Sequence, residues 1–473
     1  MNWQLALPEI VLSLCGMAIL LFGVLYRRDA SVPCNMLTLG AFLIAAFLVL
    51  SAPDGSGYGG LFVVDAFSRF VKILILAGAA LALMLSFDYN RHEGIARFEF
   101  PVLILFAVVG MMTMVSAANL MTLYLGLELQ LISLYVVTAF NRTAIRSSEA
   151  ALKYFVLGAL ASGLLLYGIS LVYGFAGSTS FAALASALSA PGGASPGLVV
   201  GIVFVIAGLV FEVSAVPFHM WTPDVYEGAP TPVTVFIGTA PKVAGMALLL
   251  RTLSTPFGHL SFDWRLLIEL VSLGSMILGA LAAIGQTNFK RLMAYSAIGH
   301  MGYTLIGLAT GTEAGLRGSL IYLVVYVFMN VGIFAGIIAM RRRGRAFEQI
   351  SDLAGLARTD PALALAFAIF LFSMAGIPPL AGFFGKLYVF LAAVQAGMWT
   401  LAVIGVLTSV VGAYYYIRIV KVMFMDAPQP AIDQRPAMVS FVAAATGLFT
   451  VFFVLFSAPI VAAAQAAAQV LFG

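Results

Sequence analysis

The chain has 473 residues, of which 62% are hydrophobic and only 9% are charged, and its mean hydropathy is +1.06. This composition excludes a water-soluble globular enzyme and predicts an all-α polytopic membrane protein, since apolar runs of about 20 residues recur along the whole length. The net charge of +4 is not gathered into a basic stripe, which argues against nucleic acid as a partner and leaves membrane lipid as the expected surroundings.

Fourteen apolar segments are expected to form transmembrane helices with short loops between them. They lie at about 5–26, 35–51, 62–86, 99–115, 117–139, 149–175, 197–220, 232–252, 264–286, 293–310, 316–340, 362–397, 400–424 and 437–467. The loop at 341–361 has apolar residues at near-helical spacing, which predicts either a short amphipathic helix on the membrane surface or a simple connector.

The distribution of basic residues predicts the orientation of these spans. With fourteen spans, sixteen Lys and Arg residues fall in the loops on one side, beginning with Arg27 and Arg28. The opposite loops carry only Arg251, Arg265 and Arg317. Because loops rich in Lys and Arg stay in the cytoplasm, both termini are expected on the non-cytoplasmic side.

Prolines interrupt two of the predicted spans. Pro217 lies in the seventh span, and Pro378 and Pro379 lie in the twelfth, each within a few residues of an intramembrane charge. Proline removes a backbone donor and frees carbonyls, which the membrane interior tolerates only against protein or water. Matched breaks of this kind are typical of inverted-repeat transporters and their ion paths, although a single proline is often a packing kink.

Ionisable residues within the apolar segments are the candidate functional groups. A charge at mid-bilayer depth costs about 2.5–3.5 kcal/mol on insertion scales, so such residues usually belong to ion paths or proton relays. They are Glu128, Lys153, Glu212, Lys242 and Lys386, to which His300 adds a titratable group in the tenth span.

These candidates differ in how firmly their position implies a function. Lys242 lies about ten residues, or about 15 Å, from either end of its span, too deep for its ammonium to reach the surface. Lys153 is only about one turn inside its span, so it can extend to the cytoplasmic surface or pair with Glu149. A hydrogen-bonded structural histidine is a realistic alternative for His300.

Four motifs in order along the chain resemble the antiporter-like subunits of respiratory complex I, the bacterial NADH:quinone oxidoreductase. The motifs are Leu123–Gln130 (LYLGLELQ), Pro217–Val233 (PFHMWTPDVYEGAPTPV), Phe289–Tyr303 (FKRLMAYSAIGHMGY) and Gly382–Lys386 (GFFGK). The resemblance covers essentially the whole chain. It implies a proton-translocating subunit with two inverted five-helix repeats, in which helices 7 and 12 are the broken ones.

The resemblance also implies a division of the chain and a set of roles. Residues 1–98 would form three N-terminal helices, 99–255 and 256–426 the two repeats, and 427–473 the last helix. Glu128 would be the key carboxylate, Lys153 an uptake or tuning group, Lys242 the central relay and Lys386 the lysine from which a proton leaves.

Partners and location follow from the same resemblance. FMN, iron–sulfur clusters and quinone would reside in partner subunits, with no cofactor in this chain. The other subunits of the membrane arm would be its neighbours in the bacterial inner membrane, with both termini periplasmic. A subunit of a multi-subunit sodium/proton antiporter is the main alternative. A haem or quinone electron carrier is disfavoured, because the four histidines offer no facing pair.

One residue departs from the family pattern. The family typically has lysine where this chain has Glu212, five residues before Pro217. If Glu212 faces Glu128, the two carboxylates are expected to compete for one proton. Lys153 would then be the candidate partner of Glu128.

Overall fold

The computed structural model describes residues 3–26, 28–189 and 195–472, so Arg27, used above for the orientation, lies outside the described residues. The α-helices of the first half are α1 (Leu7–Leu25), α2 (Ser31–Ser51), α3 (Ala66–His92), α4 (Glu99–Val115), α5 (Leu120–Thr138), α6 (Ile145–Ala176), α7 (Phe181–Leu188), α8 (Pro196–Glu212), α9 (Thr222–Gly228), α10 (Thr231–Ile237) and α11 (Ala240–Ser254). Those of the second half are α12 (Ser261–Ile284), α13 (Phe289–Thr310), α14 (Glu313–Ala339), α15 (Leu356–Thr359), α16 (Pro361–Ala375), α17 (Ala381–Gln395), α18 (Trp399–Met425) and α19 (Ala437–Gln469).

Short elements join these helices. They are the 3₁₀ helices η1 (Trp3–Ala6), η2 (Tyr58–Gly60), η3 (Gly258–Leu260) and η4 (Ile350–Leu353), and the strands β1 (Gly55–Gly57), β2 (Phe62–Val64), β3 (Arg341–Arg342) and β4 (Arg345–Ala346). β1 pairs with β2 and β3 with β4, both antiparallel, as small two-stranded ribbons. The segment 341–361 does not form one continuous amphipathic helix. A turn at Arg343 and Gly344, both with positive φ, folds its first residues into the β3–β4 hairpin, and its helical structure is limited to the short η4 and α15.

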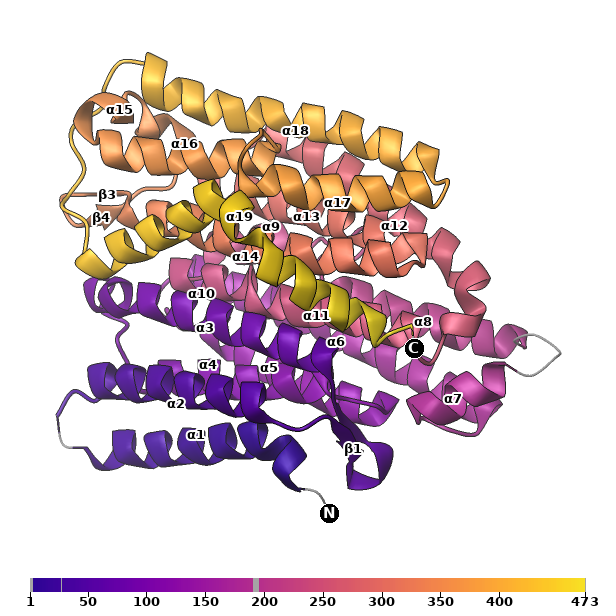
Figure 1. Ribbon diagram of the computed structural model, residues 1–473. Coiled ribbons are helices and arrows are strands. Elements are labelled where there is room, and N and C mark those ends of the chain that lie inside the picture. Colours follow the sequence, from indigo (N-terminus) through magenta and orange to yellow (C-terminus); the bar gives the residue numbers. More distant parts are fainter. Residues whose placement is uncertain (1–2, 27, 190–194, 473) are drawn as a thin grey trace.

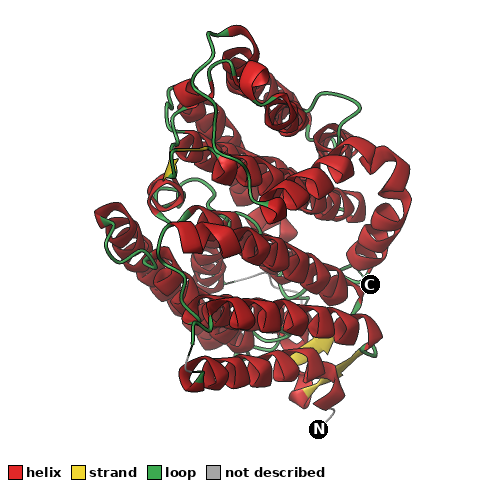
Figure 2. Ribbon diagram, turned by 90° about the vertical axis from the view of Figure 1, so that its left-hand side faces the viewer, coloured by secondary structure: helices red, strands yellow, loops and turns green. Residues whose placement is uncertain are grey.

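Most helices run side by side, from α1 and α2 at one edge to α16–α18 at the other, and α19 crosses obliquely over the middle (Figure 1). In the view of Figure 2, one pair of strands lies beside the N-terminus and the other lies well away from it, with helices between them. Within the described residues, ten helical segments are long and apolar enough to span a membrane, and α4, α8, α16 and α17 are shorter apolar helices. The protein is therefore a mostly helical membrane protein.

The third span begins later than expected. Residues 62–64 form β2, and helix α3 starts at Ala66 because Asp65 caps it, accepting a hydrogen bond from the Ser68 backbone N–H while the Ser68 hydroxyl bonds back. The Asp65 carboxylate also binds Arg251 of α11 at 2.7 Å. The cap thus fixes the start of α3 and links it to the last turn of α11.

The chain leaves the helical conformation at both proline sites. Helix α8 ends at Glu212 and regular helix resumes only at Thr222, whereas α16 ends at Ala375 and α17 begins at Ala381. A third break was not expected: the span predicted at 232–252 consists of α10 and α11, which meet at Gly238 and Thr239. Pro241 accounts for it, because proline in the first turn of α11 cannot continue a helix from α10.

Candidate functional site

Lys242 occupies the first turn of α11, directly after this third break, and its side chain is fully buried. Its ammonium nitrogen donates to the Ser214 hydroxyl at 2.6 Å and to the Val213 carbonyl at 3.3 Å. Both partners belong to the non-helical stretch after α8, where the broken helix leaves a carbonyl free. The break in one helix therefore supplies the acceptors for a cation on another.

Lys386 is held in the same way in the second half of the chain. This α17 residue is 6% exposed, and its nitrogen donates to the carbonyls of Met374 and Ala375 at 2.9 and 3.1 Å and to the Ser409 hydroxyl at 2.7 Å. The two carbonyls lie at the end of α16, where the second predicted break occurs. Each buried lysine is thus bound by carbonyl groups freed at a broken helix, one for Lys242 and two for Lys386, and by one serine hydroxyl.

His300 lies at the middle of α13, 2% exposed, between these lysines in the sequence. Its Nδ1 is 2.7 Å from the Tyr322 hydroxyl of α14, and its Nε2 is 3.1 Å from the Tyr416 hydroxyl of α18. A cavity of about 10 Å³, the space open to the centre of a water molecule, is lined by His300, Lys386 and Tyr416 among others. That volume admits about one water.

Two further tyrosines stand between Lys242 and His300. The Lys242 nitrogen is 6.0 Å from the centre of the Tyr226 ring, and the Tyr326 ring is 5.5 Å from the His300 ring. Both phenolic hydroxyls are buried and lie within reach of each other, but neither makes a hydrogen bond of good geometry among the described residues. Buried polar groups of this kind are the usual binding sites of internal water.

Glu128 and Glu212, the two candidate carboxylates of the first half, have separate hydrogen-bond partners. Glu128, half-buried on α5, accepts a hydrogen bond from the Ser162 hydroxyl of α6. Glu212, buried at the end of α8, accepts one from the Gln130 amide of α5. The Glu212 side chain also lies against Gly245, which shares a face of α11 with Lys242. Sequence reasoning missed Gln130, although it closes the first of the four motifs.

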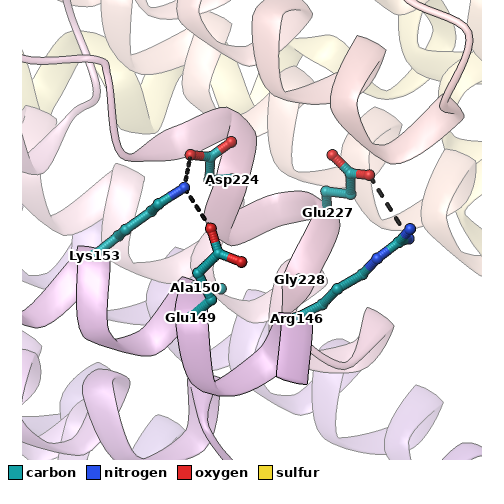
Figure 3. A pocket seen from close by; sticks show the side chains of 7 residues that line it. All are labelled: Arg146, Glu149, Ala150, Lys153, Asp224, Glu227 and Gly228. Carbon is teal, nitrogen blue, oxygen red and sulfur yellow. Dashed lines mark hydrogen bonds and ion pairs between the residues drawn. The ribbon is translucent and has the colours of Figure 1, made fainter. Parts of the chain in front are cut away.

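Lys153 lies at the surface, with 44% of its side chain exposed. Its ammonium pairs with Glu149 at 2.8 Å and with Asp224 at 2.7 Å (Figure 3). Among the ion pairs of the described residues there is none between Lys153 and Glu128, so the suggested partnership is not formed. The alternative pairing with Glu149 is the one present.

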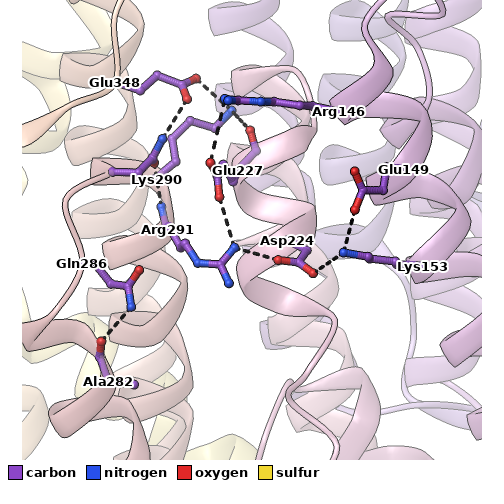
Figure 4. A network of polar contacts seen from close by, with 11 residues as sticks. Arg146, Glu149, Lys153, Asp224, Glu227, Ala282, Gln286, Lys290, Arg291 and Glu348 are labelled. Carbon is purple, nitrogen blue, oxygen red and sulfur yellow. Dashed lines mark hydrogen bonds and ion pairs between the residues drawn. The ribbon is translucent and has the colours of Figure 1, made fainter.

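Asp224 connects Lys153 to a wider network of alternating charges. Arg291 of α13 donates to Asp224 at 2.6 Å and to Glu227 at 3.1 Å, and Lys290 beside it pairs with Glu348 at 3.2 Å (Figure 4). Lys290 also donates to the carbonyls of Glu227 and Ala229. These contacts join α6, α9 and α13, so the segment that follows the first broken helix is bound to both halves of the chain.

The ion pairs of Asp224 are expected to stabilise the folded protein. Burial acts to raise the pKa of the Asp224 carboxyl, but hydrogen bonds from Lys153 and Arg291 outweigh it and hold the pKa below its ordinary value. Since this pKa is lower in the folded state, the stabilisation is present above the unfolded pKa of about 4 and is lost as pH falls through the folded value. We expect Asp224→Asn to lower the free energy of unfolding at pH 7 by about 1 kcal/mol, after allowance for solvent screening.

The measurement is the thermal unfolding midpoint of the purified complex between pH 5 and 8, where the difference from the unmodified protein stays constant. Asp263→Asn is the matched control, because Asp263 is exposed near the start of α12 and has no ion pair among the described residues. Equal shifts in the two variants, or no shift in Asp224→Asn, would contradict the assigned role of the network.

Comparison with known proteins places this geometry in a family. Residues 117–412 match the family described as NADH:quinone oxidoreductase/Mrp antiporter, TM. A curated relative from Granulibacter bethesdensis, NADH-quinone oxidoreductase subunit N, is 65% identical over 476 residues and covers 100% of both chains. Another of the same name, from Gluconacetobacter diazotrophicus, is 59% identical with the same coverage.

A solved structure supports the same relationship. A chain of respiratory complex I from Thermus thermophilus with bound aureothin is 32% identical, with a TM-score of 0.82 over 97% of this chain and 99% of that one.

Proposed function

The chain belongs to the NADH:quinone oxidoreductase/Mrp antiporter family, among the N-type membrane subunits of complex I, and from this premise we propose that it conducts protons along its buried polar residues. It is a subunit of a proton-pumping NADH–quinone oxidoreductase, and other membrane-arm subunits are its partners. One observation carries the proposed path: the ammonium groups of Lys242 and Lys386 are hydrogen-bonded in the same way, each at a broken helix and to a serine hydroxyl.

The proposed architecture consists of fourteen spans and two inverted repeats of five. Residues 1–98 form the three N-terminal helices, 99–255 and 256–426 the repeats, and 427–473 the last helix. In support, each proposed repeat contains one lysine bound to the carbonyls freed by a proline-associated break, with one serine hydroxyl beside them. The count of basic residues in the loops supports periplasmic termini.

The proposed path has an uptake region and an axis. Lys153, in the charged network at the surface, is the uptake group, and Glu128 and Glu212 respond electrostatically to events in neighbouring subunits. The axis runs from Lys242 through His300 to Lys386, with Tyr226, Tyr326, Tyr322 and Tyr416 as hydroxyl contacts and water in the remaining gaps. Each residue binds a proton and releases it to the next.

The energies are compatible with this mechanism. A change of about 3 pKa units at a buried group corresponds to about 4 kcal/mol. Moving one charge against 100 mV costs about 2.3 kcal/mol. A lysine whose pKa changes by this amount can therefore move about one proton against the membrane potential in each catalytic cycle. The energy for the change is supplied by quinone reduction in partner subunits.

We propose that this chain holds no redox cofactor, in keeping with relatives that are membrane-arm subunits. FMN, iron–sulfur clusters and quinone belong to its partners. A subunit of a sodium/proton antiporter is the weaker alternative. A chain of the Mrp complex from Dietzia sp. has a TM-score of 0.89 at 22% identity, covering 100% of this chain and 98% of that one, which shows the fold alone.

Co-purification separates the two assignments. Isolation from its native membrane with flavin and iron–sulfur subunits is the expected result, and isolation with antiporter subunits alone would reject complex I.

Glu212 gives a specific prediction within this scheme. We expect Glu212→Lys, which restores the residue type typical of the family, to change coupled quinone reduction by less than about twofold, because the Gln130 amide can turn its oxygen toward an ammonium. Glu212→Leu is expected to lower the rate more strongly, since it leaves the Gln130 amide buried and unpaired. Loss of activity in Glu212→Lys but not in Glu212→Leu would overturn the proposed electrostatic role.

A further inference from the structure

A narrow apolar groove lies on the surface of the bundle, away from the polar axis. Its floor is α14 at Ala335 and Ala339, and its walls are α16, with Ala362 and Ala366, and α19, with Ala443 among other residues. Its volume is about 440 Å³, measured as space open to the centre of a water molecule. The exposed apolar lining would face hydrocarbon in a membrane, so lipid or a partner helix must cover it.

The length of the groove fits a phospholipid acyl chain. Its lining on α19 extends from Val439 to Phe452, fourteen residues that span about 20 Å at the helical rise. The length exceeds half of a hydrocarbon core of about 30 Å, so one leaflet's acyl chain fits completely.

One end of the groove carries an arginine. Arg435, in the loop between α18 and α19, lines this end, and its recorded partner among the described residues is Asp360 at 3.4 Å. A guanidinium has five N–H donors, so this single pair leaves donors available to an anion. Because the loop joins two apolar helices, Arg435 lies at the level of lipid headgroups whichever side of the membrane it occupies.

A second basic region adjoins this end. The β3–β4 hairpin places Arg342, Arg343 and Arg345 around a basin that is also lined by Asp433, two residues before Arg435 in the same loop. Asp433 accepts hydrogen bonds from the backbone N–H groups of Gly344 at 2.7 Å and Arg343 at 2.9 Å, which hold its pKa below the ordinary value and keep it ionised. Three guanidinium groups and one carboxylate leave a net charge of +2 around the basin.

We propose that the groove between α14, α16 and α19 binds one anionic phospholipid, with an acyl chain along α19 and the phosphate at Arg435. The apolar lining and the length of the groove suit an acyl chain, and the arginines at its end select a negative headgroup over a zwitterionic one. The site is independent of the proton path, since none of the proposed relay residues lines it.

The test uses the assembled complex in nanodiscs that contain a photoactivatable phosphatidylglycerol with a diazirine on one acyl chain. Crosslinks are mapped by mass spectrometry, and the phosphatidylcholine analogue is measured in parallel. We expect the phosphatidylglycerol probe to label α16 and α19 in preference to the phosphatidylcholine probe. Arg435→Gln should reduce this labelling about fivefold, the effect of losing one basic residue near an anionic lipid.

A matched pair of variants tests the groove itself. Ala444 and Ala445 are both exposed on α19, but only Ala444 lines the groove, so Ala444→Phe should block labelling and Ala445→Phe should not. Equal labelling by the two lipids would mean that the groove holds surface lipid without selecting its headgroup. No labelling would mean that a neighbouring subunit covers the groove. Either result overturns the proposal, and both are read from the unmodified complex even if a variant fails to assemble.

Discussion

Replacing Lys242 by alanine is expected to reduce proton pumping and coupled quinone reduction to about a tenth or less in a fully assembled complex. The reason is that positioned proton-transfer groups typically contribute factors of about 10² or more. Lys242 is also fully buried, with Ser214 and Val213 as its hydrogen-bond acceptors. Pumping in proteoliposomes and NADH oxidation are measured together, with assembly checked on a native gel.

Lys242→Arg separates proton exchange from simple charge. Arginine keeps a positive charge and donates to the same acceptors, but it does not deprotonate in proteins. The relay account therefore predicts assembly with little pumping. Unmodified pumping in Lys242→Ala would remove Lys242 from the path, and recovery of pumping in Lys242→Arg would reduce its role to that of a fixed charge.

Lys386→Ala is expected to have an effect of similar size, because this lysine is the second buried ammonium on the proposed axis and shares a water-sized cavity with His300. Proton release is measured from proteoliposomes during NADH oxidation. Lys421→Ala is the matched control, since Lys421 is an exposed lysine near the end of α18 that pairs with Asp426. Comparable losses in the two lysine variants would indicate a general effect of removing a positive charge.

The sequence was sufficient to predict the helical architecture and both proline-associated breaks. Proline lacks the backbone donor that a helix needs, and this constraint acts locally, so it can be read from Pro217, Pro378 and Pro379 alone. The buried positions of Lys242, Lys386 and His300 follow from their depth within apolar runs. The break before Lys242 was equally local, and Pro241 was the signal that could have revealed it.

The partners of these residues could not be predicted in the same way. Contacts such as Gln130 with Glu212, or Tyr416 with His300, join residues that are 82 and 116 positions apart, so they depend on how whole helices pack. The pattern at 341–361 was informative only in part, for a related reason. Ile350, Leu353 and Leu356 lie in the short η4 and α15, whereas the glycine turn of the hairpin and its contacts to Asp433 determine the conformation of the first residues.

Lys153 shows that a tertiary contact decides which carboxylates an ammonium group pairs with. Its sequence position allowed either a partnership with Glu128 or an exposed pair with Glu149, and α9 settles the geometry by bringing Asp224 to the same ammonium. The segment Thr222–Gly228 is in turn bound by Arg291 from α13. No local pattern around Lys153 encodes that contact.

The most direct test of the central claim compares Lys242→Arg, Lys386→Arg and the double variant in one proteoliposome pumping assay. If the two lysines are links of a single path, the double variant should pump no less than the more impaired single variant, because blocking a path twice has no further effect. A pumping rate in the double variant that falls to the product of the two fractional rates of the single variants would contradict a relay that passes through both lysines. Normal pumping in either single variant would contradict it as well.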